Sequence, residues 1–235
     1  MTSVKLMYLH RRQGHLSLDE YHEHWLEHHV PRFGHVAMQA RRYALYPLVE
    51  TESPAAGSDA VYDGVSVVWF DNIERARALI DSPTVIDALS DEQRFIDHDR
   101  SIAVLATEET SIEPDGWGPI VLFRCVGYRP DAAHEAVESE RSGMRSRAAA
   151  AYRAGLCQGH VMNRRLQEAR GPERYNDLGE NRESWDEIET FYFDSLVLAR
   201  PFFHRLRDED HAESGALAQT LSFLTRRRTL KDLVR

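Results

Sequence analysis

A short pattern of aromatic and acidic residues occurs twice in the chain, and it constrains the fold more than any other feature. In each copy an aromatic-Asp pair opens an extended segment and an aromatic-Phe-Asp triplet ends it: Tyr62-Asp63 with Trp69-Phe70-Asp71, and Trp185-Asp186 with Tyr192-Phe193-Asp194. The matched aspartates share one offset (186 − 63 = 194 − 71 = 123). The Asp at each strand end is placed to cap the following helix. The pattern therefore predicts an internal repeat, and helix capping explains why the aspartate recurs in it.

Hydrophobic periodicity predicts the order βαββαβ on the N-terminal side of a linker at Glu113–Pro119 and a second copy of it after the linker. Before the linker we expect strands at 4–9, 41–49, 61–70 and 102–106, and helices at 18–30, 73–79 and 83–95. After it we expect strands at 120–126, 157–166, 187–193 and 221–226, and helices at 130–154 and 196–207. Segments rich in Gly, Pro and polar residues at 51–60 and 171–184 are predicted to be loops.

This order is that of a split βαβ, or ferredoxin-like, unit. A four-stranded antiparallel sheet with helices on one face leaves its other face bare, and two such sheets can bury both bare faces against each other. We therefore predict an α+β fold of two ferredoxin-like βαββαβ units, residues 1–112 and 118–235, packed sheet to sheet as an α/β barrel within one chain.

Composition limits the classes to which the protein can belong. Apolar residues make up 42% of the 235 positions, enough for a core, but no apolar run approaches the roughly 20 residues of a membrane helix. The N-terminus lacks the features of a secretion signal, and Cys125 and Cys157 are too few for a disulfide framework. The net charge of −9 argues against nucleic-acid binding. We expect a cytoplasmic protein that binds neither nucleic acid nor a membrane.

Histidines are concentrated near the N-terminus. Four of the 12 histidines lie within eight residues, in the run Tyr21-His22-Glu23-His24-Trp25-Leu26-Glu27-His28-His29-Val30-Pro31. Just before it, Ser17 and Glu20 have the spacing of a capping box, which predicts the start of a helix, and Pro31 predicts its end.

The histidines of this helix lie on different faces, and we expect different roles for them. Tyr21, Trp25 and His29 share one face, whereas His24 turns toward solvent. His24 and His28 have the i, i+4 spacing of metal ligands, but the sequence offers no clear third ligand, so we predict no metal site. Two interpretations of His29 stay open: a half-buried structural group, or a general acid–base whose ordinary pKa lies near neutrality.

The run also resembles a family signature. Tyr21-x-x-His24-Trp25-x-x-x-His29-x-Pro31 is similar to the aromatic-x-x-Tyr-Trp-x-x-x-His-x-Pro motif of the EthD-like proteins, which belong to the dimeric α/β-barrel (ferredoxin-like) superfamily. Further segments resemble this family in the same order: Val4–Leu9, Tyr62–Asp71 and Asp91–Ser101. The resemblance covers about residues 3–110 and departs from the family where His24 replaces Tyr and where Leu45-Tyr46-Pro47 replaces a common Gln-Asn-His. The second half lacks the His-x-Pro helix and looks like a degenerate repeat, so a functional pocket is expected in the first half.

The resemblance implies a pocket between sheet and helices that carries out proton transfer next to a carbonyl. It implies His29 as the catalytic base and His98 as a second candidate, although His98 could instead only bond a neighbouring carboxylate. Substrate-binding side chains are then expected at Tyr8, His10, Tyr21, Trp25, Tyr43, Tyr62 and Trp69. The tyrosines would donate hydrogen bonds to a developing oxyanion, and the tryptophans would supply an aromatic wall unless they belong to the core.

Relatives in this superfamily include small decarboxylases, dehydratases, polyketide cyclases and cofactor-free oxygenases. The first hypothesis is therefore a lyase, dehydratase or cyclase that needs no cofactor and acts on an aromatic or polyketide-like small molecule. The second is a non-catalytic accessory protein that binds a ligand beside an oxygenase. The third is a haem- or metal-dependent oxygenase, because other branches of the superfamily bind haem. Apolar helix faces on such a barrel can also pair, which allows a homodimer.

Overall fold

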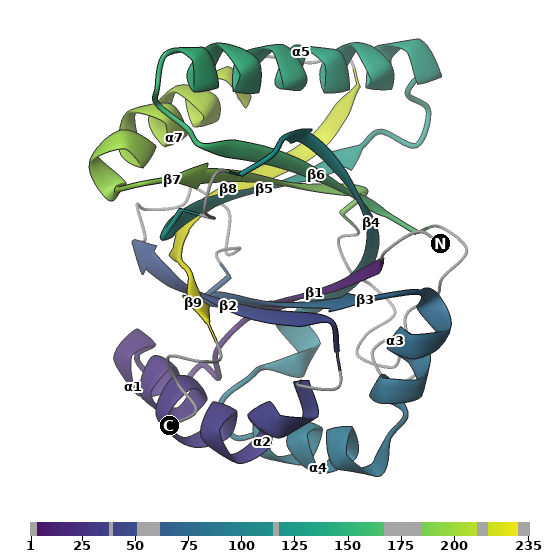
Figure 1. The fold of residues 1–235 in the computed structure, drawn as a ribbon, viewed down its shortest axis with the longest axis vertical. Helices are drawn as coiled ribbons and strands as arrows, with labels where there is room; N and C mark the ends of the chain where they lie inside the picture. The colour runs from purple at the N-terminus through teal and green to yellow at the C-terminus, as the bar shows by residue number, and fades with distance from the viewer. Residues whose placement is uncertain are drawn as a thin grey trace.

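Two layers of helices cover a strand barrel in the computed structural model, which describes residues 4–37, 40–50, 62–114, 118–166, 185–210 and 216–229 (Figure 1). The N-terminal half runs β1 (Val4–His10), α1 (Leu18–Glu23), η1 (His24–His29), α2 (Val30–Ala37), β2 (Arg42–Glu50), β3 (Gly64–Phe70), α3 (Ile73–Ile80), α4 (Pro83–Glu92), η2 (His98–Arg100) and β4 (Ile102–Ile112). The C-terminal half runs β5 (Ile120–Tyr128), α5 (His134–Arg153), β6 (Gly159–Arg165), β7 (Glu187–Phe193), α7 (Leu196–Asp210), β8 (Leu217–Arg226) and β9 (Arg228–Thr229).

The strands form one closed antiparallel sheet. Their order is β3-β1-β4-β6-β7-β5-β8-β2, and β2 pairs with β3 to close the ring, while β9 adds a short pairing to β2. Within each half the order is that of a ferredoxin-like sheet, β4-β1-β3-β2 and β8-β5-β7-β6. The predicted α/β barrel within one chain is therefore confirmed among the described residues.

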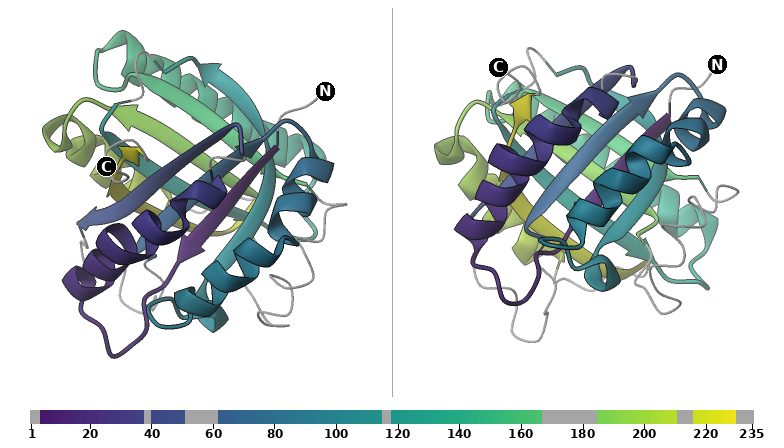
Figure 2. Two further views of the ribbon diagram at one scale, coloured as in Figure 1. Left: turned by 60° about the horizontal axis from the view of Figure 1, so that its bottom comes forward. Right: turned by 90° about the horizontal axis from the view of Figure 1, so that it is seen from below.

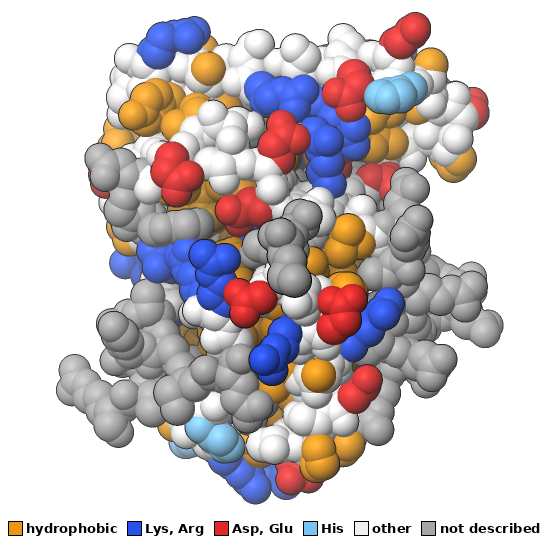
Figure 3. Space-filling view, turned by 45° about the vertical axis from the view of Figure 1, so that its right-hand side comes forward, with side chains coloured by type: hydrophobic (Ala, Val, Ile, Leu, Met, Phe, Trp, Pro, Cys, Tyr) orange, Lys and Arg blue, Asp and Glu red, His pale blue; other side chains and the backbone are white. Residues whose placement is uncertain are grey.

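The two halves meet along both sheet edges, so they are joined by hydrogen bonds as well as by packing. At one edge β4 pairs with β6, with Ala106 opposite Arg165, and at the other β2 pairs with β8, with Leu48 opposite Thr225. An ion pair of 2.9 Å between Arg145 on α5 and Glu109 on β4 also crosses from one half to the other. On the side turned forward in Figure 3, positive and negative side chains lie among one another.

Side chains alternate between the two faces of the barrel wall, as the period of two along a strand requires. Inward-facing residues of both halves, such as Met7, Val67, Phe123 and Ile188, form one core inside the barrel. Outward-facing residues pack under the helices in separate clusters on the two halves. On the N-terminal half, α1, η1, α2, α3 and α4 lie across this outer face (Figure 2).

The prediction that Pro31 ends the first long helix is wrong, because the helix continues through α2 to Ala37. The segment η1 is a π-helix, in which the N–H of Val30 donates to the carbonyl of Trp25, five residues back. Proline lacks an N–H and its ring clashes with the carbonyl four residues earlier in an α-helix. The wider π-helical turn moves that carbonyl, so Pro31 is accepted in the first turn of α2.

The predicted caps are partly corrected. The capping box of Ser17 and Glu20 is present at the start of α1. Asp71 does not cap α3, because the side chain of the next residue, Asn72, accepts the N–H of Arg75 at 2.9 Å. Helix α3 begins at Ile73, one residue too late for Asp71 to be its N-cap.

Several element boundaries also differ from the predicted ones. Helix α5 begins at His134, so Pro130 lies before it. Strand β4 is longer than predicted because pairing with β6 of the other half extends it, and β8 is longer because its first residues pair with β5 of the same half. The predicted loops at 51–60 and 171–184 and part of the linker lie outside the described residues. None of the described helices combines the length and apolar character needed to cross a membrane.

Candidate functional site

A pocket of about 110 Å³ lies in the N-terminal half, between the outer face of the sheet and the helices above it. Its lining side chains come from β1, β2, β3, η1, α2, α3 and α4: Leu6, Tyr8, Tyr43, Ser66, Val68, Phe70, His29, Val30, Phe33, Gly34, Leu79, Ile80, Val85, Ala88, Leu89 and Glu92. The strand residues reach it by alternation, since their neighbours in sequence point into the barrel. The pocket is therefore separate from the barrel interior.

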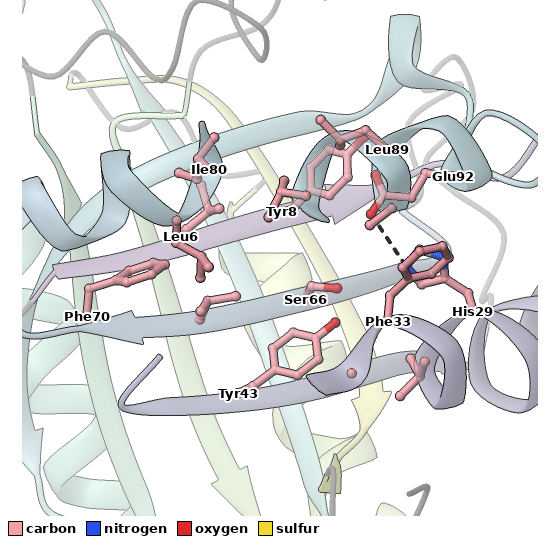
Figure 4. A pocket seen from close by; sticks show the side chains of 16 residues that line it. Leu6, Tyr8, His29, Phe33, Tyr43, Ser66, Phe70, Ile80, Leu89 and Glu92 are labelled. Carbon is pink, nitrogen blue, oxygen red and sulfur yellow. Dashed lines mark ion pairs between the residues drawn. The ribbon is translucent and has the colours of Figure 1, made fainter. Parts of the chain in front are cut away.

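The pocket has a polar end and an apolar end. Glu92, His29, Ser66 and the hydroxyl of Tyr43 lie together at one end, and Leu6, Phe70 and Ile80 lie at the other (Figure 4). Such a division suits a ligand with one polar group on an apolar body.

Glu92 ends α4 and is the most strongly perturbed acid of the pocket. Its Oε2 is buried and makes no hydrogen bond with the described residues. The nearest basic atoms are His29 Nε2, 3.7 Å from Oε1, and His98 Nε2, 3.6 Å from Oε2. Burial raises the pKa of Glu92 to about 8, and the negative charge of Asp91 adds to the shift. The carboxyl is therefore poised to hold or release a proton near neutral pH.

His29 lies beside Glu92 and is fixed by a second carboxylate. Its ring is 7% exposed, and its Nδ1 lies 2.9 Å from Asp91 Oδ2. A carboxylate accepts hydrogen bonds, so this contact assigns the ring proton to Nδ1 and leaves the lone pair of Nε2 toward Glu92. Burial lowers the pKa of His29, and Asp91 partly opposes the shift. The neutral imidazole is thus the favoured form.

The other predicted residues divide between the pocket, its rim and the layer beneath it. Tyr8 and Tyr43 line the pocket, while His98 lies behind Glu92 with its ring 6.4 Å from that of Tyr8. His10 is buried one layer deeper, where its Nδ1 lies 2.9 Å from the hydroxyl of Tyr21 and its Nε2 lies 3.1 Å from Ser66 Oγ.

Trp25 belongs to the same buried layer. Its ring centroid lies 4.8 Å from that of His10, and its side chain packs on Gly64, where an added Cβ would stand 2.5 Å from it. This layer of His10, Tyr21 and Trp25 supports the pocket floor through Ser66, and none of the three lines the pocket itself.

Tyr62 and Trp69 lie in the barrel core, on the opposite side of the sheet from the pocket. The indole N–H of Trp185 donates to the hydroxyl of Tyr62 at 2.9 Å, and that of Trp69 donates to Glu108 at 3.3 Å. Both side chains therefore have structural partners inside the barrel.

Sequence reasoning did not single out Glu92, Ser66 or Phe33 as pocket residues. The acidic pair of Asp91 and Glu92, near the end of the helix predicted at 83–95, was the available signal, but the contact of Asp91 with His29 joins positions 62 residues apart in the chain. Within the described part of the chain no group of three His, Cys, Asp or Glu side chains has the arrangement of a metal site.

The sequence and the fold each match known proteins. Residues 13–99 match the EthD domain family. No curated protein matches the sequence. Among solved structures, an anthrone oxidase-like protein aligns with 98% of this chain and 94% of its own, at 13% identity and a TM-score of 0.57. A mutant chlorite dismutase from Candidatus Nitrospira defluvii aligns with 99% of this chain and 94% of its own, at 8% identity and a TM-score of 0.55. Identities this low show a shared fold alone.

Proposed function

We propose that this chain, whose residues 13–99 match the EthD domain family, is an enzyme of the lyase, dehydratase or cyclase type that moves protons next to a carbonyl or phenol. One observation carries the proposal. Burial raises the pKa of the Glu92 carboxyl to about 8, and this carboxyl lies beside a neutral histidine, His29, at the polar end of an apolar pocket. A pair of groups with these properties is suited to general acid–base catalysis near neutral pH.

Each polar group of the pocket can be given a role. The lone pair of His29 Nε2 is a base for a proton next to the carbonyl, and the protonated Glu92 is an acid for a leaving or enolate oxygen. Burial raises the pKa of Tyr43, so its phenol keeps its proton and can donate to a developing oxyanion together with Ser66. In its ionised form Glu92 can take the place of His29 as the base.

The shape of the pocket supports a small, largely apolar substrate. Its volume of about 110 Å³ lies below the roughly 300–1,000 Å³ of pockets for drug-sized ligands. The polar end accommodates a carbonyl or phenol oxygen, and the wall of Leu6, Phe70 and Ile80 accommodates an apolar ring or chain. An aromatic or polyketide-like compound of few rings has these features.

A haem does not fit these residues. A porphyrin is a large planar ring that needs a wider cavity than this one, and it needs an axial ligand. The histidine of the pocket, His29, has its Nδ1 bonded to Asp91 and its Nε2 turned to Glu92. No step of the proposed reaction therefore passes through a haem.

The experiment compares turnover of a panel of phenolic acids and aromatic β-ketones by the wild type and three variants. His29→Ala and Glu92→Gln should each lower the rate by roughly 10²–10⁴-fold, the usual effect of removing an acid or base. The matched control is His28→Ala, because His28 is exposed on the same helical segment. Circular dichroism establishes that each variant is folded.

Two outcomes would contradict the proposal. Wild-type rates in both pocket variants would exclude Glu92 and His29 from the chemistry. Tight binding of a panel compound that depends on His29, with no turnover by any form of the protein, would favour the accessory ligand-binding hypothesis.

We also propose that residues 1–112 and 118–235 arose as tandem copies of one unit. Equivalent aspartates support this interpretation: Asp63 accepts the backbone N–H of Arg12 at 2.8 Å, and Asp186 accepts that of Tyr128 at 2.8 Å. The shared contact explains why the aspartate recurs after 123 positions.

A further inference from the structure

The histidine run has a feature that the proposed reaction does not use. One carboxylate oxygen, Asp91 Oδ2, lies 2.9 Å from His29 Nδ1 and 3.6 Å from His24 Nε2. In an α-helix two residues five positions apart are rotated by about 140° around the axis. The i to i+5 hydrogen bonding of the π-helix η1 brings His24 and His29 toward the same side. The π-helix therefore lets both rings approach Asp91.

The same groups form a continuous series from the pocket outward. Glu92 Oε1 lies 3.7 Å from His29 Nε2, and His29 in turn contacts Asp91, which contacts His24. The exposed fraction of the side chains rises along the series, from 8% at His29 through 10% at Asp91 to 30% at His24. His24 also keeps its Nε2 buried and directed at Asp91. The pocket acid is thus connected to the surface by groups that can each accept and release a proton.

We propose that His29, Asp91 and His24 conduct protons between Glu92 and solvent. His24 and Asp91 would then serve the reaction without touching the substrate. This inference rests on the proposed function of Glu92, because an acid in a small pocket must exchange its proton with water between turnovers.

The transfer balances at every step. A proton leaving Glu92 Oε1 joins His29 Nε2, and the proton of His29 Nδ1 moves to Asp91 Oδ2. Asp91 passes it to His24 Nε2, and His24 releases its other ring proton to water. The reverse sequence returns one proton to Glu92 and restores the original tautomer of His29. No other bond changes.

Two arginines lie near the series of His29, Asp91 and His24 and influence where its protons reside. Arg94 Nε lies 3.9 Å from Asp91 Oδ1, and Arg32 on α2 acts on His29 electrostatically. Arg32 disfavours a positive charge on His29. Burial opposes the ionised form of Asp91, but the hydrogen bond from His29 and the nearby charges, Arg94 among them, lower the pKa of Asp91 and leave it ready to accept a proton.

The test measures proton exchange without a substrate. In protein labelled with ¹⁵N-histidine, magnetisation transfer from water reports how fast the His29 Nδ1 proton exchanges. His24→Ala and His24→Gln should slow this exchange by at least about tenfold, while the loss remains smaller than the roughly 10²–10⁴-fold typical of a direct acid or base. The control His28→Ala should exchange at the wild-type rate. A purely structural role of His24 would not change the exchange while the backbone amide spectrum stays the same.

The outcomes separate this inference from the proposed function. Unchanged exchange in both His24 variants overturns the proton path, whatever the turnover data show. Slow exchange in these variants together with wild-type turnover by Glu92→Gln supports the path but overturns the role of Glu92 in catalysis. Equal slowing by His28→Ala would mean that exchange reports general loosening of η1, and it would also overturn the path.

Discussion

Replacing Glu92 with Gln should stabilise the protein while it abolishes activity. The substitution keeps the size of the side chain and removes its charge. Glu92 is 14% exposed in its side chain and its Oε2 has no hydrogen bond with the described residues. An ionised carboxylate in this position lacks compensation for the lost hydration, so the folded state disfavours it. A neutral amide avoids that cost.

The magnitude follows from the pKa. Burial raises the pKa of Glu92 from 4.5 to about 8, and each pH unit between the two values corresponds to about 1.4 kcal/mol. The folded state binds the proton more tightly, so stability is greatest below pH 4.5 and falls as the pH rises toward 8. The loss is about 3 kcal/mol at pH 7 (7 − 4.5 = 2.5 units) and about 5 kcal/mol above pH 8 (8 − 4.5 = 3.5 units). Glu92→Gln removes this pH-dependent loss.

Urea denaturation at pH 5, 6, 7 and 8 checks the prediction. The difference in free energy of unfolding between Glu92→Gln and the wild type should grow steadily with pH over this range. The exposed Glu27 of η1 provides a control, and Glu27→Gln should change the free energy of unfolding only slightly. A stabilisation by Glu92→Gln that is equal at pH 5 and pH 8, or no stabilisation at all, would refute the argument from burial.

Other substitutions test the packing of each half. Gly64→Ala should lower stability by about 1–3 kcal/mol and reduce activity, because its Cβ would stand 2.5 Å from Trp25 beneath the pocket; thermal denaturation measures the loss, and a wild-type Tm would contradict the contact. Gly143→Ala on α5 meets no atom within 4 Å and should instead raise stability by roughly 0.5–1 kcal/mol. Burial lowers the pKa of His160 to about 3, so below pH 6.5 only the unfolded chain takes up the proton and the wild type loses stability. His160→Leu should remove this loss of stability in acid. In urea denaturation, the free energy of unfolding of this variant relative to the wild type should be about 2 kcal/mol higher at pH 5 than at pH 8 (6.5 − 5 = 1.5 units). An equal difference at both pH values would contradict the prediction.

The sequence by itself predicted most of the strand and helix order, because periodicity and capping are local properties. The capping box at Ser17 and Glu20 is present at the start of α1. The inference that two half-covered sheets must bury each other also led to the closed barrel, since bare apolar sheet faces have few stable alternatives. Asp63 and Asp186 each accept a backbone N–H at 2.8 Å in their own half, and Asn72 rather than Asp71 caps α3.

Tertiary structure decided which residues form the site. A period of two separates the faces of a strand but does not tell which face meets the helices, so Tyr62 and Trp69 could not be assigned to the core from sequence. The raised pKa of Glu92 depends on burial between helix and sheet, where groups distant in sequence exclude water. The π-helix at η1 places His24 and His29 near Asp91, an arrangement that α-helical spacing does not predict. Local sequence determines the elements, whereas the charge states and partners of the site depend on contacts that exist only after folding.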